Sequence, residues 1–281
     1  DGRIRFAGKE TSDNICRRGE DLRAGDLVFR RGELLRPAHI AVLAAVGCAE
    51  PQVFRQVRVG VLATGNELVA PERKPEGACL RDSNSPQLCA QLQEMRALST
   101  FYGIATDEPG AIDRKIRQAA AEQDLVLVSG GVSTGDLDLV PAALRACGFD
   151  LRFESVAMQP GRPTVFGRHP GSGVFCCGLP GNPVSTYIVF EIILKAFLYR
   201  LMGHEYRCVT VSATLDAPVT RRKAKRQATV PVAFTGPGRI APVEFHGSAH
   251  IHALCRAQAL LTLAAGVAEI PAGTLVHVRP L

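Results

Sequence analysis

Hydrophobic positions change their spacing along the chain, and the change divides the sequence into three parts. Between about residues 57 and 202, short apolar runs alternate with amphipathic segments, which is the pattern of strands alternating with helices. The pattern predicts strands at 57–63, 101–104, 124–129, 153–158 and 174–177, and helices at 86–98, 112–121, 139–147 and 184–201. This alternation predicts an α/β domain whose mostly parallel sheet lies in three layers, between helices on both faces.

The segments on either side of this α/β part follow other patterns. Residues 1–52 contain a polar, glycine-rich stretch and one apolar-periodic segment, 37–46, which starts at a proline and stops before a glycine, as helices do. Residues 26–29 and 34–35 are predicted as strands. Because this part is too small to bury a core alone, we expect it to be the end of a domain that begins outside the chain.

Short strands separated by glycine and proline turns follow Gly203 and predict an all-β domain. The predicted organisation is therefore a partial N-terminal domain at 1–52, an α/β domain at 53–204, and a C-terminal β-domain at 205–281.

Composition and charge narrow the classes of function. Hydrophobic residues make up 46% and charged residues 21%, an ordinary globular mixture. No apolar run reaches the roughly 18–20 residues that cross a bilayer, and the first residues do not resemble a signal peptide, so we expect a cytoplasmic protein without a membrane span. The formal charge of +6 suits an anionic small molecule as well as a polyanion. Aromatic residues total 6% and tryptophan is absent, which disfavours a stacking platform for single-stranded nucleic acid.

Three features suggest a metal or a nucleic acid, and each has a simpler interpretation. The nine cysteines include no C-x2-C pair, and most have apolar neighbours, so reduced core thiols are expected. The basic run at 221–226 is interpreted as a solvated loop because no aromatic residues interleave with it, and no nucleic-acid partner is expected. His250 and His252 would share one face of a strand, with His246 nearby, but the spacing indicates no third metal ligand.

Four polar loops are predicted where strands end, the edge at which open α/β sheets bind ligands. The loop at 129–138, Ser-Gly-Gly-Val-Ser-Thr-Gly-Asp-Leu-Asp, is the most distinctive. Its glycines allow backbone N–H groups to approach a phosphate, Ser133 and Thr134 are candidate donors, and Asp136 and Asp138 are candidate ligands of a divalent cation. The alternative is a strand-to-helix turn with either aspartate as N-cap, since the loop is neither a Walker motif nor a dinucleotide fingerprint.

The other three loops are 64–68, 158–163 and 178–185. Each combines glycine or proline with one polar or charged side chain, namely Glu67, Arg162 or Asn182. A single loop of this kind is usually only a turn. Four at one edge of a sheet favour a preorganised site for an anion and a metal.

Five motifs follow one another in a recognisable order and spacing: T-G-N-E-L at 64–68, D-S-N at 82–84, S-G-G-V-S-T-G-D-L-D at 129–138, P-G-R-P at 160–163 and L-P-G-N-P-V-S at 179–185. They resemble the molybdopterin molybdenumtransferase family, the proteins called MoeA in bacteria and the E domain of gephyrin. The resemblance covers nearly the whole chain, and it implies that the α/β domain at 53–204 is of molybdopterin-binding type. It implies an elongated homodimer that performs Mg²⁺-assisted insertion of molybdate into adenylylated molybdopterin and releases AMP.

The resemblance also implies roles for particular residues. Glu67, Asp107 and Asp138 resemble the family's acidic catalytic residues, with Asp107 and Asp138 as ligands of Mg²⁺. On composition alone, Asp107 would be part of a solvated turn. The implied substrate-binding residues are Thr64, Gly65, Ser129, Gly130, Gly131, Ser133, Asp136, Pro160, Arg162, Pro180, Asn182, Ser185 and Ser248, the last beside a proposed oxyanion site.

Some positions depart from the family pattern. The N-terminal D-G-Y-A motif has no counterpart, Gln159 stands where a basic residue is common, and Asn66 stands where aspartate is common. Pro231 aligns with a position where some relatives carry arginine. These departures favour binding over full turnover.

Two other functions remain open on the sequence. The first is a molybdopterin adenylyltransferase or nucleotide pyrophosphatase of the same fold, against which the terminal β-domain and the 179–185 motif argue. The second is a non-catalytic dimeric scaffold of gephyrin type that binds a partner peptide. A molybdopterin-adenylylating enzyme is a further possible partner.

Overall fold

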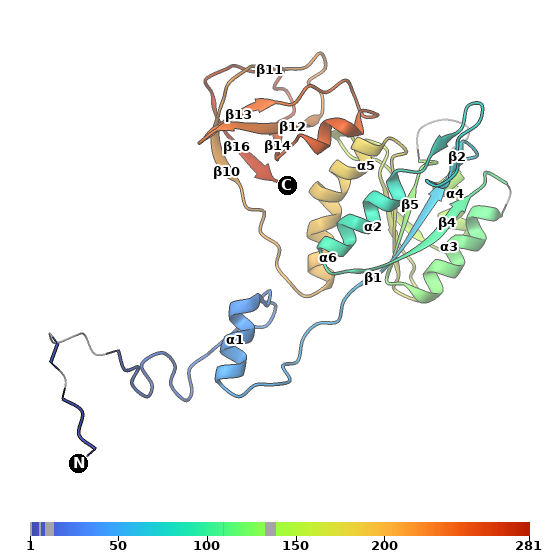
Figure 1. Ribbon diagram of the computed structural model, residues 1–281. Helices are drawn as coiled ribbons and strands as arrows, with labels where there is room; N and C mark the ends of the chain where they lie inside the picture. Colours follow the sequence, from blue (N-terminus) through green and yellow to red (C-terminus); the bar gives the residue numbers. More distant parts are fainter. Residues whose placement is uncertain (1, 6, 9–13, 109, 133–138) are drawn as a thin grey trace.

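The computed structural model describes residues 2–5, 7–8, 14–108, 110–132 and 139–281. An extended N-terminal segment carrying helix α1 (Pro37–Ala45) leads into an α/β domain, and a β-domain follows (Figure 1). The helix begins at the expected proline, but residues 26–29 and 34–35 form no strand. Strands need a neighbour to pair with, and the described residues of this segment provide none. Within the described ranges, no helix combines the length and apolar character that crossing a bilayer requires.

The centre of the α/β domain is a sheet in the order β4-β1-β5-β9-β8-β6. Its strands are β1 (Arg58–Thr64), β4 (Leu98–Ala105), β5 (Leu125–Ser129), β6 (Asp150–Phe153), β8 (Val165–Arg168) and β9 (Phe175–Leu179). The pairs among β4, β1, β5 and β9 are parallel, whereas β8 pairs antiparallel with both β9 and β6. The mostly parallel sheet is confirmed, and its parallel strands all end at one edge.

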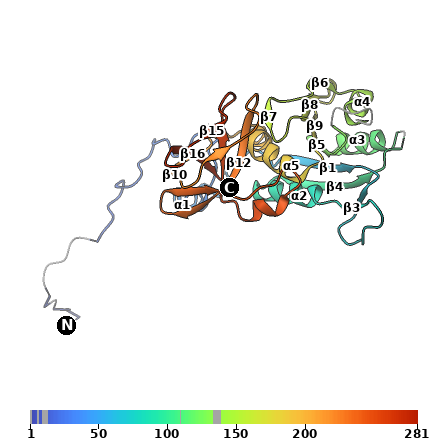
Figure 2. The ribbon, with the colours of Figure 1, turned by 90° about the horizontal axis from the view of Figure 1, so that it is seen from above.

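Helices cover both faces of this sheet because alternate strand residues point to opposite sides. Helices α2 (Asn84–Glu94) and α5 (Pro183–Val189) lie on one face, and α3 (Ala111–Glu122) and α4 (Leu139–Ala146) on the other (Figure 2). Helix α6 (Lys195–Leu201) adds Leu198 to the same apolar cluster as α2 and α5. Val61 belongs to the same apolar cluster as Leu88 of α2, while the next residue, Leu62, belongs to the cluster on the other face with Ile116 of α3. All four side chains are fully buried, and each such burial contributes about 1.5–3 kcal/mol.

The predicted helix at 184–201 is interrupted by a π-helical stretch, η1 (Phe190–Leu194). This wider turn contains Glu191, a buried carboxylate that accepts hydrogen bonds from Gln91 Nε2 at 3.1 Å and Lys195 Nζ at 2.8 Å. Buried charges persist in proteins when such partners are available. The π-turn thus accompanies a buried ion pair that helical periodicity does not reveal.

The predicted strand at 153–158 is wrong. Strand β6 ends at Phe153, and a separate short strand, β7 (Met158–Gln159), pairs with the terminal domain. Strand β8 was not predicted, because Gly167 and the preceding Pro163 obscure its alternation. Gly167 is required there, since a Cβ would lie 2.7 Å from the carbonyl oxygen of Asp150 on the paired strand.

The C-terminal part forms the expected all-β domain. Its sheet runs β13-β10-β16-β14-β12-β7, and an additional β13–β12 pairing closes it into a barrel around an apolar core. The barrel strands are β10 (Val211–Leu215), β12 (Gln227–Gly236), β13 (Arg239–Pro242), β14 (Ala259–Leu263) and β16 (Leu275–Pro280). Strand β7 joins β12 in parallel, so two residues of the α/β domain extend the sheet of the terminal domain.

The remaining elements are short. Strands β2 (Leu68–Val69) and β3 (Leu80–Arg81) pair beside the end of β1, and β11 (Val219–Thr220) pairs with β15 (Glu269–Ile270). A 3-10 helix, η2 (Ile251–Cys255), contacts α5. His252 lies in this helix rather than on a strand, so the assumed same-face arrangement of His250 and His252 is wrong.

Candidate functional site

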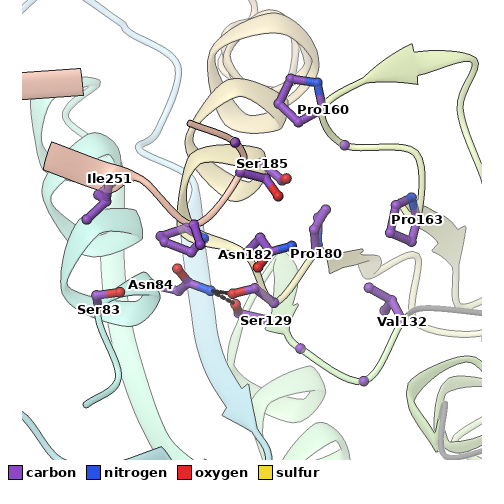
Figure 3. A pocket seen from close by; sticks show the side chains of 18 of the residues that line it. Ser83, Asn84, Ser129, Val132, Pro160, Pro163, Pro180, Asn182, Ser185 and Ile251 are labelled. Carbon is purple, nitrogen blue, oxygen red and sulfur yellow. Dashed lines mark hydrogen bonds between the residues drawn. The ribbon is translucent and has the colours of Figure 1, made fainter. Parts of the chain in front are cut away.

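A cavity of about 970 Å³ lies at the carboxyl edge of the parallel strands, where the terminal domain meets the α/β domain (Figure 3). Loops after β1, β5 and β9 line one side of it, and the segment 245–251 of the terminal domain lines another. This volume is at the upper end of the range for small-molecule sites. A ligand with several linked groups fits such a space.

The structure brings most of the expected substrate-binding residues together. Those lining the cavity are Thr64, Glu67, Ser129, Gly130, Gly131, Pro160, Arg162, Pro180, Asn182, Ser185 and Ser248. Gly65 lies in the same loop behind Glu67 and does not itself line the cavity. The expected residues Ser133, Asp136 and Asp138 lie outside the described residues.

Gly65 provides the space in which the Glu67 carboxylate lies. Its φ of +140° is a backbone conformation that favours glycine, and a Cβ there would lie 2.7 Å from Cδ of Glu67. The Glu67 side chain is exposed and borders the cavity. The loop after β1 therefore presents a carboxylate at the cavity rim. The carboxylate lies in space that a side chain at residue 65 would otherwise occupy.

Asp107 does not line the cavity. It forms a reciprocal pair with Asn66, in which Asp107 N donates to Asn66 Oδ1 at 3.0 Å and Asn66 N donates to Asp107 Oδ2 at 3.3 Å. The pair joins the loops that follow β1 and β4. Asn66 supplies a neutral acceptor for this contact, whereas an aspartate there would place two carboxylates side by side.

Asp82 and Asn84 were not predicted as site residues, although both belong to the D-S-N motif. Asp82 is buried at the start of α2, and its Oδ1 accepts hydrogen bonds from the backbone N–H groups of Asn84 and Ser85, each at 3.1 Å. The carboxylate therefore caps the helix N-terminus. Among the described residues, Asp82 Oδ2 has no hydrogen-bond partner.

Asn84 connects two of the cavity loops. Its Nδ2 lies 2.8 Å from Ser129 Oγ at the end of β5 and 2.8 Å from the carbonyl oxygen of Gly181, in the loop after β9 (Figure 3). The side chain is buried and lines the cavity. The D-S-N motif at 82–84 was the sequence feature from which Asn84 could have been predicted as a site residue.

Arg226 is a further cavity-lining residue that was not predicted from the sequence. The run 221–226 was interpreted as a solvated loop, yet Arg226 is only partly exposed, lines the cavity and donates from Nη1 to the carbonyl oxygen of Met158 at 3.3 Å. Arg221 also bonds to the protein, with its Nε 2.6 Å from the carbonyl oxygen of Val267. Among the basic residues of this run, only Arg222, Lys223 and Lys225 are exposed as expected.

Charged side chains of both signs line the cavity. Carboxylates of Glu67 and Asp82 lie beside the loops after β1 and β3, where Arg81 of β3 also lines the cavity, and guanidinium groups of Arg162 and Arg226 lie beside β7 and β12. Within the described ranges, neither Arg162 nor Arg226 forms an ion pair with a carboxylate. Unpaired guanidinium groups favour binding of anionic oxygen atoms.

The described residues contain no group of three or more His, Cys, Asp or Glu side chains placed to hold a metal ion. All nine cysteines are unpaired, but the expectation of core thiols holds only in part. Cys147, Cys176 and Cys177 are buried, and burial raises the pKa of Cys176 to about 12. Cys16, Cys208 and Cys255 are exposed, and the other three are partly buried.

Comparison with known protein families gives matches along most of the chain. Residues 3–47 match the MoeA N-terminal region (domain I and II), residues 60–200 a probable molybdopterin binding domain, and residues 213–281 the MoeA C-terminal region (domain IV). The three matched segments follow the N-terminal, α/β and terminal β parts of the structure.

Individual relatives agree with this result. The chain is 30% identical to molybdopterin molybdenumtransferase of Haemophilus influenzae, over 100% of the chain and 70% of that protein. It is 33% identical to molybdopterin molybdenumtransferase 2 of Mycobacterium tuberculosis, over 95% of the chain and 67% of that protein.

Solved structures show the same fold. Two structures of molybdopterin biosynthesis MoeA proteins from Pyrococcus horikoshii superpose with TM-scores of 0.81 and 0.76, at 29% and 25% identity. The matches cover 93% and 94% of this chain, and the chain spans less than two thirds of each, 64% and 63%. With the family matches and the 30% identity over its full length, the chain belongs to the molybdopterin molybdenumtransferase family of molybdenum cofactor biosynthesis.

Proposed function

We propose that this chain inserts molybdate into adenylylated molybdopterin and releases AMP. The observation that carries the proposal is the cavity between the strand-end loops of the α/β domain and the 245–251 segment of the terminal domain. Its size suits a ligand made of a pterin, a pyrophosphate and a nucleoside. Its lining offers hydroxyl, amide and guanidinium donors to the anionic parts of such a ligand.

The lining residues provide two kinds of hydrogen-bond donor, serine hydroxyl groups and arginine guanidinium groups. Ser129, at the start of the glycine loop, is placed to donate to a phosphate oxygen, and Arg162 and Arg226 offer charged donors to an oxyanion such as molybdate. Ser185 and Ser248 line the same cavity and offer hydroxyl groups. Binding both reactants in one cavity brings them into reach and orients them.

Mg²⁺ fits the carboxylates of Glu67 and Asp82 in the cavity lining. This ion usually takes one or two carboxylates together with substrate phosphates, and Glu67 and Asp82 supply carboxylates beside the glycine loop. Asp107 and Asp138 remain proposed ligands from the family resemblance. When bound, Mg²⁺ neutralises charge on the pyrophosphate and so favours departure of AMP.

A discriminating experiment measures AMP release from adenylylated molybdopterin in the presence of Mg²⁺, with and without molybdate, and with sulfate as a control oxyanion. We expect AMP release that requires molybdate. Equal release without molybdate would indicate a nucleotide pyrophosphatase instead. Tight binding of the adenylylated ligand with no release under any condition would indicate a scaffold.

We also propose that the chain forms a homodimer in the cytoplasm, with a molybdopterin-adenylylating enzyme as a possible partner. Helix α1 has no buried residue, and Ile40 within it and Val46 at its C-terminal end are 53% and 45% exposed, so an apolar surface is available for a second subunit. Nine unpaired cysteines suit a reducing compartment. Light scattering should give twice the chain mass of 30.1 kDa, and a monomer at high concentration would contradict the dimer.

A further inference from the structure

The side-chain amide of Asn84 lies between the two loops that form the floor of the cavity. Nδ2 is 2.8 Å from Ser129 Oγ and 2.8 Å from the carbonyl oxygen of Gly181, and the side chain is only 7% exposed (Figure 3). These partners are 45 and 97 residues away in the sequence. Asn84 therefore ties the end of β5 to the loop after β9.

The chemistry of the partners determines which way the amide points. The Gly181 carbonyl oxygen can only accept a hydrogen bond, so the atom facing it must be the NH₂ group and not the amide oxygen. An NH₂ group has two protons. One is donated to the carbonyl oxygen of Gly181 and the other to Ser129 Oγ, so Nδ2 has no proton left for another hydrogen bond.

This arrangement fixes the role of the Ser129 hydroxyl. Because Oγ already accepts a proton from Asn84, the hydroxyl proton of Ser129 is available for a different acceptor. No described residue accepts it, and Ser129 lines the cavity at the start of the glycine loop. The hydroxyl is thus prepared to donate to a bound ligand.

We propose that Asn84 is a positioning residue that holds the Ser129 hydroxyl as a hydrogen-bond donor to a phosphate oxygen of the ligand. The inference deepens the proposed function and rests on it for the identity of the ligand. The unpaired guanidinium groups of Arg162 and Arg226 favour a negatively charged acceptor in this cavity. Ser129 lies at the carboxyl end of the parallel strand β5, which is where ligands bind in open α/β sheets.

The proposal is tested with Asn84→Asp, Ser129→Ala and the double variant, titrated calorimetrically with AMP and with inorganic pyrophosphate in the presence of Mg²⁺. In Asn84→Asp an acceptor oxygen replaces Nδ2, so the Ser129 proton turns toward it and is withdrawn from the ligand. We expect each single variant to bind about 10- to 100-fold more weakly, the size of one hydrogen bond to a charged group. The double variant should bind no more weakly than Ser129→Ala.

A merely structural role gives a different result. Additive losses in the double variant, or wild-type affinity in folded Asn84→Asp, would overturn the proposal. If Asn84→Asp fails to fold because its carboxylate faces the Gly181 carbonyl, Asn84→Ala replaces it in the same cycle, with the same expected non-additivity. Urea unfolding of every variant separates the loss of stability from the loss of affinity.

Ser85 offers a matched control. It is the next residue on α2, is equally buried, does not line the cavity, and its hydroxyl has no hydrogen-bond partner among the described residues. Ser85→Ala should leave the affinity for both ligands unchanged. An equal loss in this variant would show that any change at the start of α2 disturbs binding, and would count against a specific role for Asn84.

Failure of the donor assignment and failure of the proposed function give different experimental results. If wild-type chain binds pyrophosphate with the expected coupling of Asn84 and Ser129 but shows no molybdate-dependent AMP release, the enzymatic proposal fails and the donor assignment stands. If the wild-type chain binds neither AMP nor pyrophosphate, the donor assignment is overturned, because no phosphate acceptor reaches Ser129.

Discussion

The backbone N–H of Val184 donates a hydrogen bond to the carbonyl oxygen of Ser248 at 3.1 Å. Val184 is the second residue of α5, and the residue before it, Pro183, has no N–H to offer. The bond therefore satisfies a donor at the helix N-terminus with an acceptor from the terminal domain. It holds the 245–251 segment over the cavity, so substitutions in the terminal domain can change ligand binding without altering the sheet.

Arg226→Gln should weaken binding of pyrophosphate about tenfold, because the variant removes a charged donor from the cavity wall. Arg226→Lys should retain part of the affinity, since its charge remains. Calorimetric titration at two salt concentrations measures the effect, and the salt dependence should be smaller in the glutamine variant. Arg222→Gln, an exposed change in the same run, is the control. Equal affinities of the Arg222 and Arg226 variants would show that only the overall charge matters.

Glu67→Gln should lower molybdate-dependent AMP release at least tenfold while leaving the free energy of unfolding within about 0.5 kcal/mol, because the side chain is exposed at the cavity rim. The lost carboxylate should raise the Mg²⁺ concentration needed for half-maximal release. Glu72→Gln changes another exposed carboxylate that does not line the cavity and should behave as wild type. An unchanged Mg²⁺ dependence in Glu67→Gln would exclude Glu67 from metal binding.

Gly131→Ala should cost stability for reasons of packing as well as of backbone conformation. Gly131 has φ +61°, and a Cβ there would lie 2.9 Å from Cγ2 of Val140 and 3.0 Å from Oγ1 of Thr64. Gly238 has a similar φ of +67° but nothing within 4 Å of its Cβ position. Urea unfolding should therefore show a loss of about 1 kcal/mol for Gly238→Ala and about 2–4 kcal/mol for Gly131→Ala. Equal losses would mean that the loop relaxes around the added methyl group.

Asp124 should make the stability of the α/β domain depend on pH. Its carboxylate accepts hydrogen bonds from Arg55 Nη1 at 2.6 Å and Arg55 Nη2 at 2.8 Å, and also from the backbone N–H of Arg58 at 2.9 Å. The hydrogen bonds from Arg55, above all, hold the pKa of Asp124 well below its ordinary value. The stabilisation is therefore fully present above the unfolded pKa of about 3.9 and is lost as the pH falls below it.

Asp124→Asn should consequently lower the free energy of unfolding by about 1–2 kcal/mol at pH 7, a figure reduced for the solvent exposure of Arg55, and by less at pH 3. Urea unfolding at the two pH values measures the difference. Asp150→Asn removes an exposed ion pair with Arg152 and should cost less than about 0.5 kcal/mol. A loss of equal size at pH 7 and pH 3 for Asp124→Asn would show that the charge of the carboxylate is not the cause.

The α/β order and the loop motifs could be predicted because they depend on local features of the chain. Short continuous apolar runs marked β1 and β5, period-3.6 patterns marked α3 and α4, and glycines marked turns with positive φ, as at Gly130 and Gly131. Each of these signals lies within one short stretch of residues. Placement of strand-end loops at one edge then follows from the parallel pairing of the strands.

Only the tertiary structure decided which other side chains reach the cavity. Arg226 joins it because β12 pairs with β7, and Asn84 joins it because its amide meets two loops that are far away in the sequence. Asp107, expected in the site, instead pairs with Asn66. The physical reason is common to all three: each position depends on hydrogen bonds between segments distant along the chain, and the periodicity of one segment contains no information about its partner.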